Sequence, residues 1–133
     1  MVADDKDCFL YHSVLAESAD ARCVAEIVKT ARHFNSRAGL TGLLVFDGQR
    51  FCQYLEGPQA ALTALVAKLQ RDPRHTRFTP LLHAPLSGAR RFQHWAMGYA
   101  YVDDGDPLGA IAALPGDEAL QYLQALAFTI DAV

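Results

Sequence analysis

The order in which hydrophobic patterns follow one another is the strongest constraint on what this chain can fold into. Short apolar runs with the character of strands alternate with two stretches whose apolar residues recur at the period of a helix. The first helical stretch repeats through Val24, Ile27, Val28, Ala31 and Phe34. The second repeats through Leu62, Leu65, Val66 and Leu69. Each repeat marks one apolar face of an amphipathic helix, which must be buried against another element.

Five strands are expected around these two helices, at residues 9–15, 40–46, 49–56, 77–82 and 95–102. Asp47–Gly48 separates the second run from the third, and this dipeptide predicts a tight two-residue hairpin. The resulting order, β-α-β-β-α-β-β, is that of an α+β ferredoxin-like βαββαβ fold with an added fifth strand. Both helices are then expected on one face of the sheet.

The ends of the first helix and the tail beyond the sheet carry further signals. Residues 18–20 offer caps for the start of the first helix, and Asn35 with Gly39 provides stop chemistry at its end. After a polar, turn-forming stretch, residues 108–114 and 118–130 are expected to form two short C-terminal helices. These helices are too short to make a domain of their own, so they must pack on the sheet or on a partner.

Length and composition exclude several classes of protein. The 133 residues fit one domain, and a hydrophobic content of 51% excludes intrinsic disorder. The net charge of −3 argues against nucleic-acid binding and against a polybasic membrane patch. No apolar run approaches the roughly 18 residues that a membrane-spanning helix needs.

The amino terminus and the cysteines indicate a cytoplasmic protein. The first seven residues are acidic where a secretory signal is basic and then apolar. The cysteines Cys8, Cys23 and Cys52 are odd in number and far apart, which is typical of reduced thiols. Their spacing relative to the five histidines predicts no metal site.

Polar residues at positions where the pattern predicts core are the most informative part of the sequence. Gln53 lies between Phe51 and Leu55 on one face of the third strand, and Tyr11 has a similar place on the first strand. Because the first and third strands are central neighbours in this fold, Tyr11 and Gln53 can meet. Taken singly, Tyr11 can be core, Asn35 a helix C-cap and Gln53 an outward residue. Taken together, they suggest a ligand pocket between the two helices and the sheet.

Five motifs in the same order and spacing extend this interpretation. They are residues 9–13, 35–42, 51–58, 72–75 and 91–98. Together they resemble the BLUF domain, a blue-light sensor that uses FAD. The resemblance covers about residues 8–101, and we expect a BLUF flavin-binding domain over this range. Residues 102–133 are then a C-terminal helical extension, too short to hold a cyclase or phosphodiesterase domain.

The resemblance implies a role for each of seven residues. Tyr11 and Gln53 match the photoactive pair. The residues expected to contact a non-covalently bound FAD are Tyr11, Asn35, Gln53, Arg74 and His75. Trp95 and Met97 match the residues implicated in passing the signal outward, and the sequence leaves open which of the two points inward.

The chemistry explains why a glutamine is needed at position 53. Light makes the flavin a strong oxidant, and Tyr11 can then give up an electron and its proton through a bridge that both donates and accepts. An amide does both; glutamate is costly to bury, and asparagine is one methylene shorter. The rearranged Gln53 hydrogen bonds then constitute the signal.

The expected protein is therefore a photoreceptor and not an enzyme, and it signals to a separate downstream protein. We expect a homo-oligomer in the cytoplasm, without metal, nucleic-acid or membrane partners. Two alternatives remain at this point. One is an acylphosphatase-like hydrolase that uses Arg22 and Asn35 for phosphate, and the other is a ferredoxin-like interaction module that binds no flavin.

Overall fold

The computed structural model describes residues 5–92, 96–102 and 105–127. Its elements are β1 (Lys6–Leu15), α1 (Cys23–Ala38), β2 (Thr41–Phe46), β3 (Arg50–Pro58), α2 (Gln59–Arg71), β4 (His75–Pro85), β5 (Gly98–Tyr101), α3 (Pro107–Ala112) and α4 (Gly116–Ala127). The strands form one sheet in the order β4-β1-β3-β2-β5. Neighbours are antiparallel except that β5 runs parallel to β2. The expected ferredoxin-like fold with an added fifth strand is confirmed.

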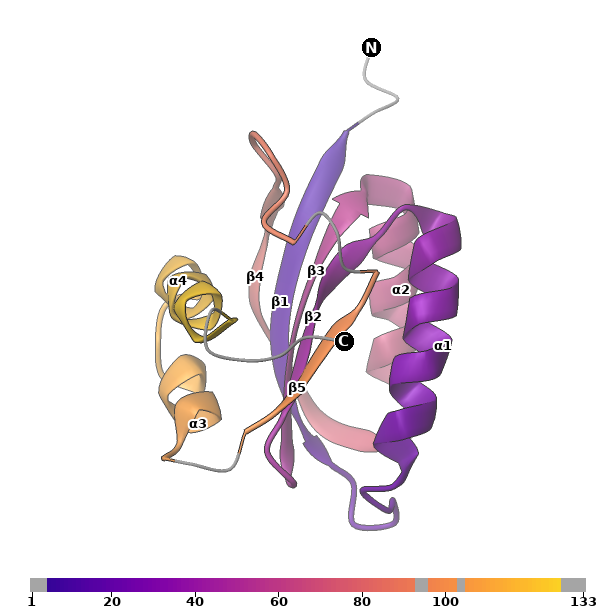
Figure 1. The fold of residues 1–133 in the computed structure, drawn as a ribbon, viewed down its shortest axis with the longest axis vertical. Helices are drawn as coiled ribbons and strands as arrows, with labels where there is room; N and C mark the ends of the chain where they lie inside the picture. Colours follow the sequence, from indigo (N-terminus) through magenta and orange to yellow (C-terminus); the bar gives the residue numbers. More distant parts are fainter. Residues whose placement is uncertain (1–4, 93–95, 103–104, 128–133) are drawn as a thin grey trace.

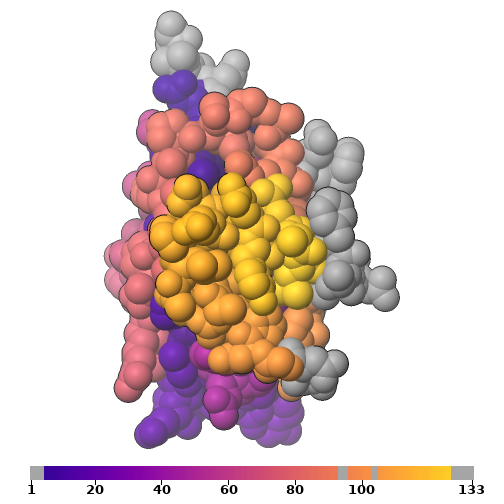
Figure 2. All heavy atoms as spheres, turned by 90° about the vertical axis from the view of Figure 1, so that its left-hand side faces the viewer, coloured from indigo at the N-terminus to yellow at the C-terminus, as the bar shows by residue number. Residues whose placement is uncertain are grey.

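The sheet is covered on both faces, which divides the core in two. Helices α1 and α2 lie side by side on one face, as expected, and α3 with α4 covers the other (Figure 1). Figure 2 shows α3 and α4, in orange and yellow, as a compact layer over the sheet. The C-terminal helices therefore bury their apolar faces on the sheet itself. Each face holds its own cluster of buried side chains.

Helix α1 ends at Gly39, one of its two expected stop residues. Asn35 is not the helix end: it lies inside α1, and its side chain is fully buried. The helix stops at Gly39, which has a left-handed φ of 75° and donates its backbone N–H to Asn35 O. Asp20 accepts a hydrogen bond from the N–H of Arg22, but no side chain caps the helix start. The chain therefore continues as helix until the first glycine that can adopt the left-handed turn.

The hairpin between β2 and β3 forms, with its tip one residue later than expected. The Asp47 N–H donates to Arg50 O at 3.1 Å, so these two residues close the hairpin around Gly48 and Gln49. The Asp47 carboxylate accepts the N–H groups of Gln49 and Arg50, which holds it in the stem. Gly48 takes the positive φ, 97°, that the turn requires.

The two strands at the sheet edges differ most from their expected bounds. β4 is longer than 77–82, because it pairs with β1 from Asp7 to Leu15. β5 is shorter than 95–102 and extends over Gly98–Tyr101. Trp95 lies outside the described residues, so its expected place is untested.

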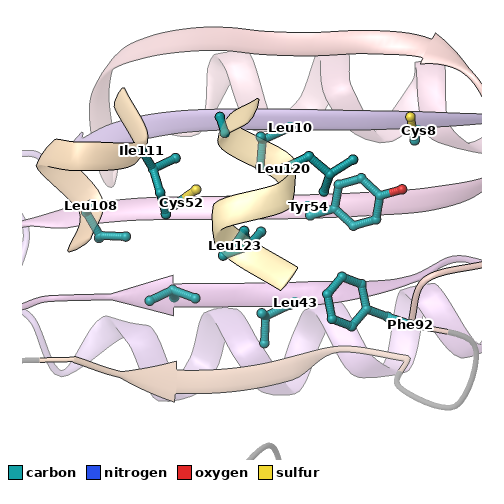
Figure 3. Close-up of a cluster of buried hydrophobic side chains, with 12 residues drawn as sticks. Cys8, Leu10, Leu43, Cys52, Tyr54, Phe92, Leu108, Ile111, Leu120 and Leu123 are labelled. Atoms are coloured by element: carbon teal, nitrogen blue, oxygen red, sulfur yellow. The ribbon is translucent and has the colours of Figure 1, made fainter. Parts of the chain in front are cut away.

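A substitution at Leu123 tests whether packing of α4 on the sheet contributes to the stability of the fold. Its side chain is fully buried between α4 and the sheet (Figure 3). We expect Leu123→Ala to lower the free energy of unfolding by about 2–5 kcal/mol, because the cavity cannot refill. Gln121→Ala on the exposed side of α4 should change it by less than about 0.5 kcal/mol. Guanidinium unfolding measures both; equal stabilities would show that α4 does not contribute to the core.

Candidate functional site

A cavity of about 230 Å³ lies between helices α1 and α2 and the sheet face that they cover. Its walls come from β1, α1, β2, β3, α2 and the start of β4. The lining residues are Tyr11, Ile27, Thr30, Ala31, Phe34, Leu44, Phe51, Gln53, Leu65, Lys68, Leu69, Asp72, Arg74 and His75. Most of this surface is apolar, and the few polar groups converge from different elements, which is the character of a small-molecule site.

Tyr11 and Gln53 form a direct pair at the sheet wall of this cavity. They are register partners on the central strands β1 and β3, and both side chains are buried. Tyr11 Oη donates a hydrogen bond to Gln53 Oε1 at 2.5 Å. Burial raises the pKa of the Tyr11 phenol above its ordinary value near 10, so the proton stays on the tyrosine. The contact expected from strand order is thus present and has a defined donor.

The other end of the Gln53 amide faces Met97. Gln53 Nε2 lies 3.7 Å from Met97 Sδ, and Met97 is 1% exposed. Met97 is therefore inward, while Trp95, the other candidate that the sequence left open, lies outside the described residues. A thioether is a weak acceptor, so the NH₂ group keeps the capacity to donate to a ligand in the cavity.

Asn35 carries a buried acceptor without a donor. Its Nδ2 donates to Ala96 O at 2.8 Å, while its Oδ1 has no hydrogen-bond partner among the described residues. Asn35 does not itself line the cavity, but it follows Phe34, which does. An unpaired buried carbonyl costs about 1–3 kcal/mol, so this atom calls for a donor that a bound ligand would supply.

Arg74 and His75 both line the cavity, and both are already held by protein groups. Arg74 forms an ion pair with Asp72 at 2.7 Å, and its guanidinium lowers the pKa of that carboxyl. His75 Nε2 contacts Leu69 O at 2.5 Å, and its Nδ1 contacts Ser13 Oγ at 2.7 Å. Because both ring nitrogens are engaged, His75 offers the cavity its ring and no spare hydrogen bond.

Two lining residues were not singled out from the sequence. Lys68 projects from the last turn of α2, and its Nζ lies 4.9 Å from the centre of the Phe34 ring. Thr30 adds a hydroxyl from α1. The only sequence signal for Lys68 is its place three residues after Leu65, on the flank of the apolar stripe. Such flanking lysines are usually solvent-facing, so the pattern alone did not distinguish it.

The matched family decides what kind of site this is. A family model described as "BLUF: Sensors of blue-light using FAD" matches residues 7–98, which is more than half of the chain. The chain belongs to the BLUF family. It is a flavin-based blue-light sensor, and the two alternatives, a small hydrolase and a flavin-free module, gain no support. Arg22, which a phosphate-binding hydrolase would have recruited, is exposed and paired with Asp20.

BLUF relatives show how this sensor region occurs in larger proteins. The chain is 34% identical over 85 residues to the blue light- and temperature-regulated antirepressor BluF of Escherichia coli K12, covering 62% of this chain and 20% of BluF. It is 31% identical over 96 residues to the photoactivated adenylate cyclase subunit alpha of Euglena gracilis, covering 72% of this chain and 9% of that protein. The chain thus spans a fifth or less of these relatives.

A solved structure matches nearly the whole chain. The dark-state structure of BlrB, a BLUF protein, superimposes with a TM-score of 0.79 at 28% identity, covering 92% of this chain and 95% of BlrB. The agreement extends beyond the family match at residue 98, so the fold similarity includes part of the region that carries α3 and α4. The chain therefore shares its fold with nearly the whole BlrB chain.

In the part of the chain that the structure describes, neither a cluster of metal-ligating side chains nor a cysteine lines the cavity. Among residues 5–92, 96–102 and 105–127, no three His, Cys, Asp or Glu side chains gather to hold a metal ion. Cys52 lies on the opposite sheet face from Gln53, as expected, and burial raises the pKa of its thiol to about 12. Within the same ranges, no helix combines the length and apolarity needed to cross a membrane.

Proposed function

We propose that this BLUF chain binds FAD non-covalently and that Tyr11 and Gln53 are its switching pair. The observation that carries the proposal is the Tyr11–Gln53 hydrogen bond at the wall of the cavity. A flavin ring presents both donors and acceptors at its edge. Gln53 Nε2 and Asn35 Oδ1 are the matching groups with unused capacity on the protein side. The residues present therefore fit a flavin.

The protein's part in the light reaction follows from this geometry. Excited by blue light, the flavin supplies a strong oxidant. Tyr11 is the donor at hand, and its proton has an acceptor in Gln53 Oε1. Once the electron and the proton have returned to Tyr11, a Gln53 amide that has turned over would direct Nε2 to Tyr11 and Oε1 to Met97. Each exchanged hydrogen bond is worth about 0.5–1.5 kcal/mol net, so the turned state would be metastable and revert thermally.

FAD is the flavin that we assign, and two cationic side chains in the cavity wall are compatible with an anionic ligand, although Arg74 is already paired with Asp72. Lys68 and Arg74 both line the cavity near the end of α2. FMN carries the same ring and a phosphate, so the choice rests on the family description. Heat release of the bound flavin followed by chromatography identifies it. Recovery of FMN from protein supplied with both flavins would overturn the assignment to FAD.

An absorption spectrum before and after illumination tests the function as a whole. Purified protein should be yellow, and blue light should cause a reversible red shift of the flavin bands. The shift reports a changed hydrogen bond to an oxidised flavin. Protein that stays colourless after reconstitution with excess FAD would instead support the flavin-free module.

Asn35 should contribute to flavin affinity through its unpaired oxygen. We expect Asn35→Ala to weaken flavin binding by about tenfold or more, because a buried hydrogen bond to the ligand is lost. Fluorescence titration of apoprotein with FAD measures the dissociation constant. Ser36→Ala, one residue further on the exposed side of α1, is the matched control and should bind normally. Unchanged affinity in both variants would remove Asn35 from the flavin site.

The signal must leave the flavin site and reach another protein. We propose that residues 8–101 form the sensor and residues 102–133 an extension that passes the signal to a separate protein in the cytoplasm, from a homo-oligomer. The relatives' names link BLUF regions to an antirepressor and to adenylate cyclases, which supports an output outside the sensor. Light scattering in darkness and under blue light measures the oligomeric state; a monomer under both conditions would contradict that part of the proposal.

A further inference from the structure

Glu56 is a fully buried carboxylate that the light reaction does not use. It lies on β3 three residues after Gln53 and shares the other face of the sheet with Tyr54. Its Oε1 accepts hydrogen bonds from Tyr54 Oη at 2.9 Å and from Arg91 N at 3.1 Å. Its Oε2 accepts from Phe92 N at 2.8 Å and from Thr41 Oγ1 at 3.4 Å. A buried charge is tolerated when it is satisfied in this way.

Two of these donors belong to the connection between β4 and β5. The backbone N–H groups of Arg91 and Phe92 are both held by Glu56, and Figure 3 shows the Phe92 ring beside Tyr54. Glu56 thus fixes the position of this connection on the sheet. Charge-assisted hydrogen bonds of this kind are stronger than those between neutral groups.

The same connection ends at the photoactive site. Ala96 O accepts from Asn35 Nδ2 at 2.8 Å, and Met97 O accepts from Arg32 Nε at 3.0 Å. Met97 Sδ contacts the Gln53 amide. A change in the Gln53 hydrogen bonds therefore acts directly on Met97, a few residues after the point that Glu56 holds.

Arg91 also reaches α4. Its Nε donates to Gln124 Oε1 at 3.1 Å. One residue is therefore bonded through its backbone to Glu56 on the sheet and through its side chain to a helix on the outer layer. This makes Arg91 the point at which the connection, the sheet and α4 meet.

We propose that Glu56 is a positioning residue that holds residues 91–92 on the sheet, so that movement at Met97 is passed through Arg91 to Gln124 on α4. The proposal rests on the proposed function, because Gln53 is the group that changes with light. Without Glu56, residues 91–92 lose these two hydrogen bonds to the sheet, and a displacement at Met97 does not reach α4. With Glu56, it is delivered to α4.

Glu56→Gln tests this with a change of a few atoms. A glutamine can turn only one oxygen toward the two backbone N–H groups, so either Arg91 N or Phe92 N loses its acceptor. Hydrogen exchange followed by mass spectrometry on the full chain with flavin is the measurement. In darkness, amides of residues 91–92 should exchange about tenfold faster than in the wild type, the effect of one lost hydrogen bond. The light-induced change in exchange of α4 should be lost, while the red shift of the flavin remains.

Two variants serve as controls on either side of Glu56. Tyr54→Phe removes the hydroxyl that donates to the Glu56 carboxylate but leaves the hydrogen bonds from Arg91 N and Phe92 N. Amide exchange at residues 91–92 should therefore stay at the wild-type rate. Gln124→Ala leaves the Glu56 bonds intact and cuts only the contact to α4. It should keep the wild-type red shift and exchange at 91–92 while losing the light response of α4. Because Gln124 is at the surface layer, this variant is informative even if Glu56→Gln does not fold.

The outcomes separate this proposal from the function on which it rests. A wild-type protein that binds flavin but shows no red shift contradicts the proposed function, whereas the dark exchange rates at residues 91–92 still report on Glu56. A normal red shift with unchanged α4 exchange in the wild type overturns the route to α4. An intact α4 response in Gln124→Ala, or wild-type exchange at 91–92 in Glu56→Gln, overturns it as well.

Discussion

Replacing Gln53 by leucine should abolish the red shift while leaving the flavin bound. Leucine has nearly the volume of glutamine but can neither accept from Tyr11 Oη nor donate from Nε2, so no hydrogen bond is left to exchange. The Tyr11 hydroxyl also loses its buried acceptor, and we expect the free energy of unfolding to fall by about 1–3 kcal/mol. Difference spectra under blue light measure the first effect and guanidinium unfolding the second.

Gln49→Leu is the matched control for this substitution. It makes the same chemical change at an exposed position in the β2–β3 hairpin, away from the cavity, and should keep the full red shift. A Gln53→Leu protein that binds flavin and shifts like the wild type would show that the amide is not the switch. The Tyr11–Gln53 hydrogen bond would then be a structural feature only.

Replacing Tyr11 by phenylalanine removes the donor of the same hydrogen bond and should abolish the normal photocycle. Phenylalanine keeps the ring and its stacking on Phe78, with centroids 4.4 Å apart, and deletes only the hydroxyl. Because the raised pKa keeps Tyr11 protonated, the wild type offers both an electron and a proton at this position, and the variant offers neither. We expect bound flavin, no red-shifted state and stronger flavin fluorescence, measured by absorption and emission under blue light.

Tyr99→Phe is the matched control, because it removes a tyrosine hydroxyl at a different position. Tyr99 lies on β5 next to Val28 and Arg32 of α1 and does not line the cavity beside Tyr11, so loss of its hydroxyl should leave the red shift in place. Loss of the photocycle in Tyr99→Phe and its survival in Tyr11→Phe would reverse the assignment of the donor. Survival in both would remove tyrosine from the mechanism.

Residues whose role depends on local pattern could be predicted from the sequence. The alternation that places Gln53 between Phe51 and Leu55, and the order of strands and helices, were enough to predict that Tyr11 and Gln53 meet across β1 and β3. Strand order in this fold follows from connectivity, and the face of a strand residue follows from the period of two. The opposite placement of Cys52 follows for the same reason.

Roles that depend on contacts between distant segments were decided by the tertiary structure. Asparagine is a residue type typical of helix ends, yet Asn35 is buried inside α1. Its side-chain amide donates a hydrogen bond to the backbone oxygen of Ala96, which is 61 residues further along the chain. The choice of Met97 as the inward residue, and the binding of residues 91–92 by Glu56, likewise need the packed position of the β4–β5 connection.

By itself the sequence determined the fold class, the family and the meeting of Tyr11 with Gln53, because hydrophobic periodicity and motif spacing are local properties of the chain. Only the tertiary structure decided that His75 has no spare hydrogen bond, that Lys68 faces the cavity and that Glu56 is a buried acceptor for another segment. A side chain's hydrogen-bond partners are set by which segments pack together, and that packing is a property of the whole core.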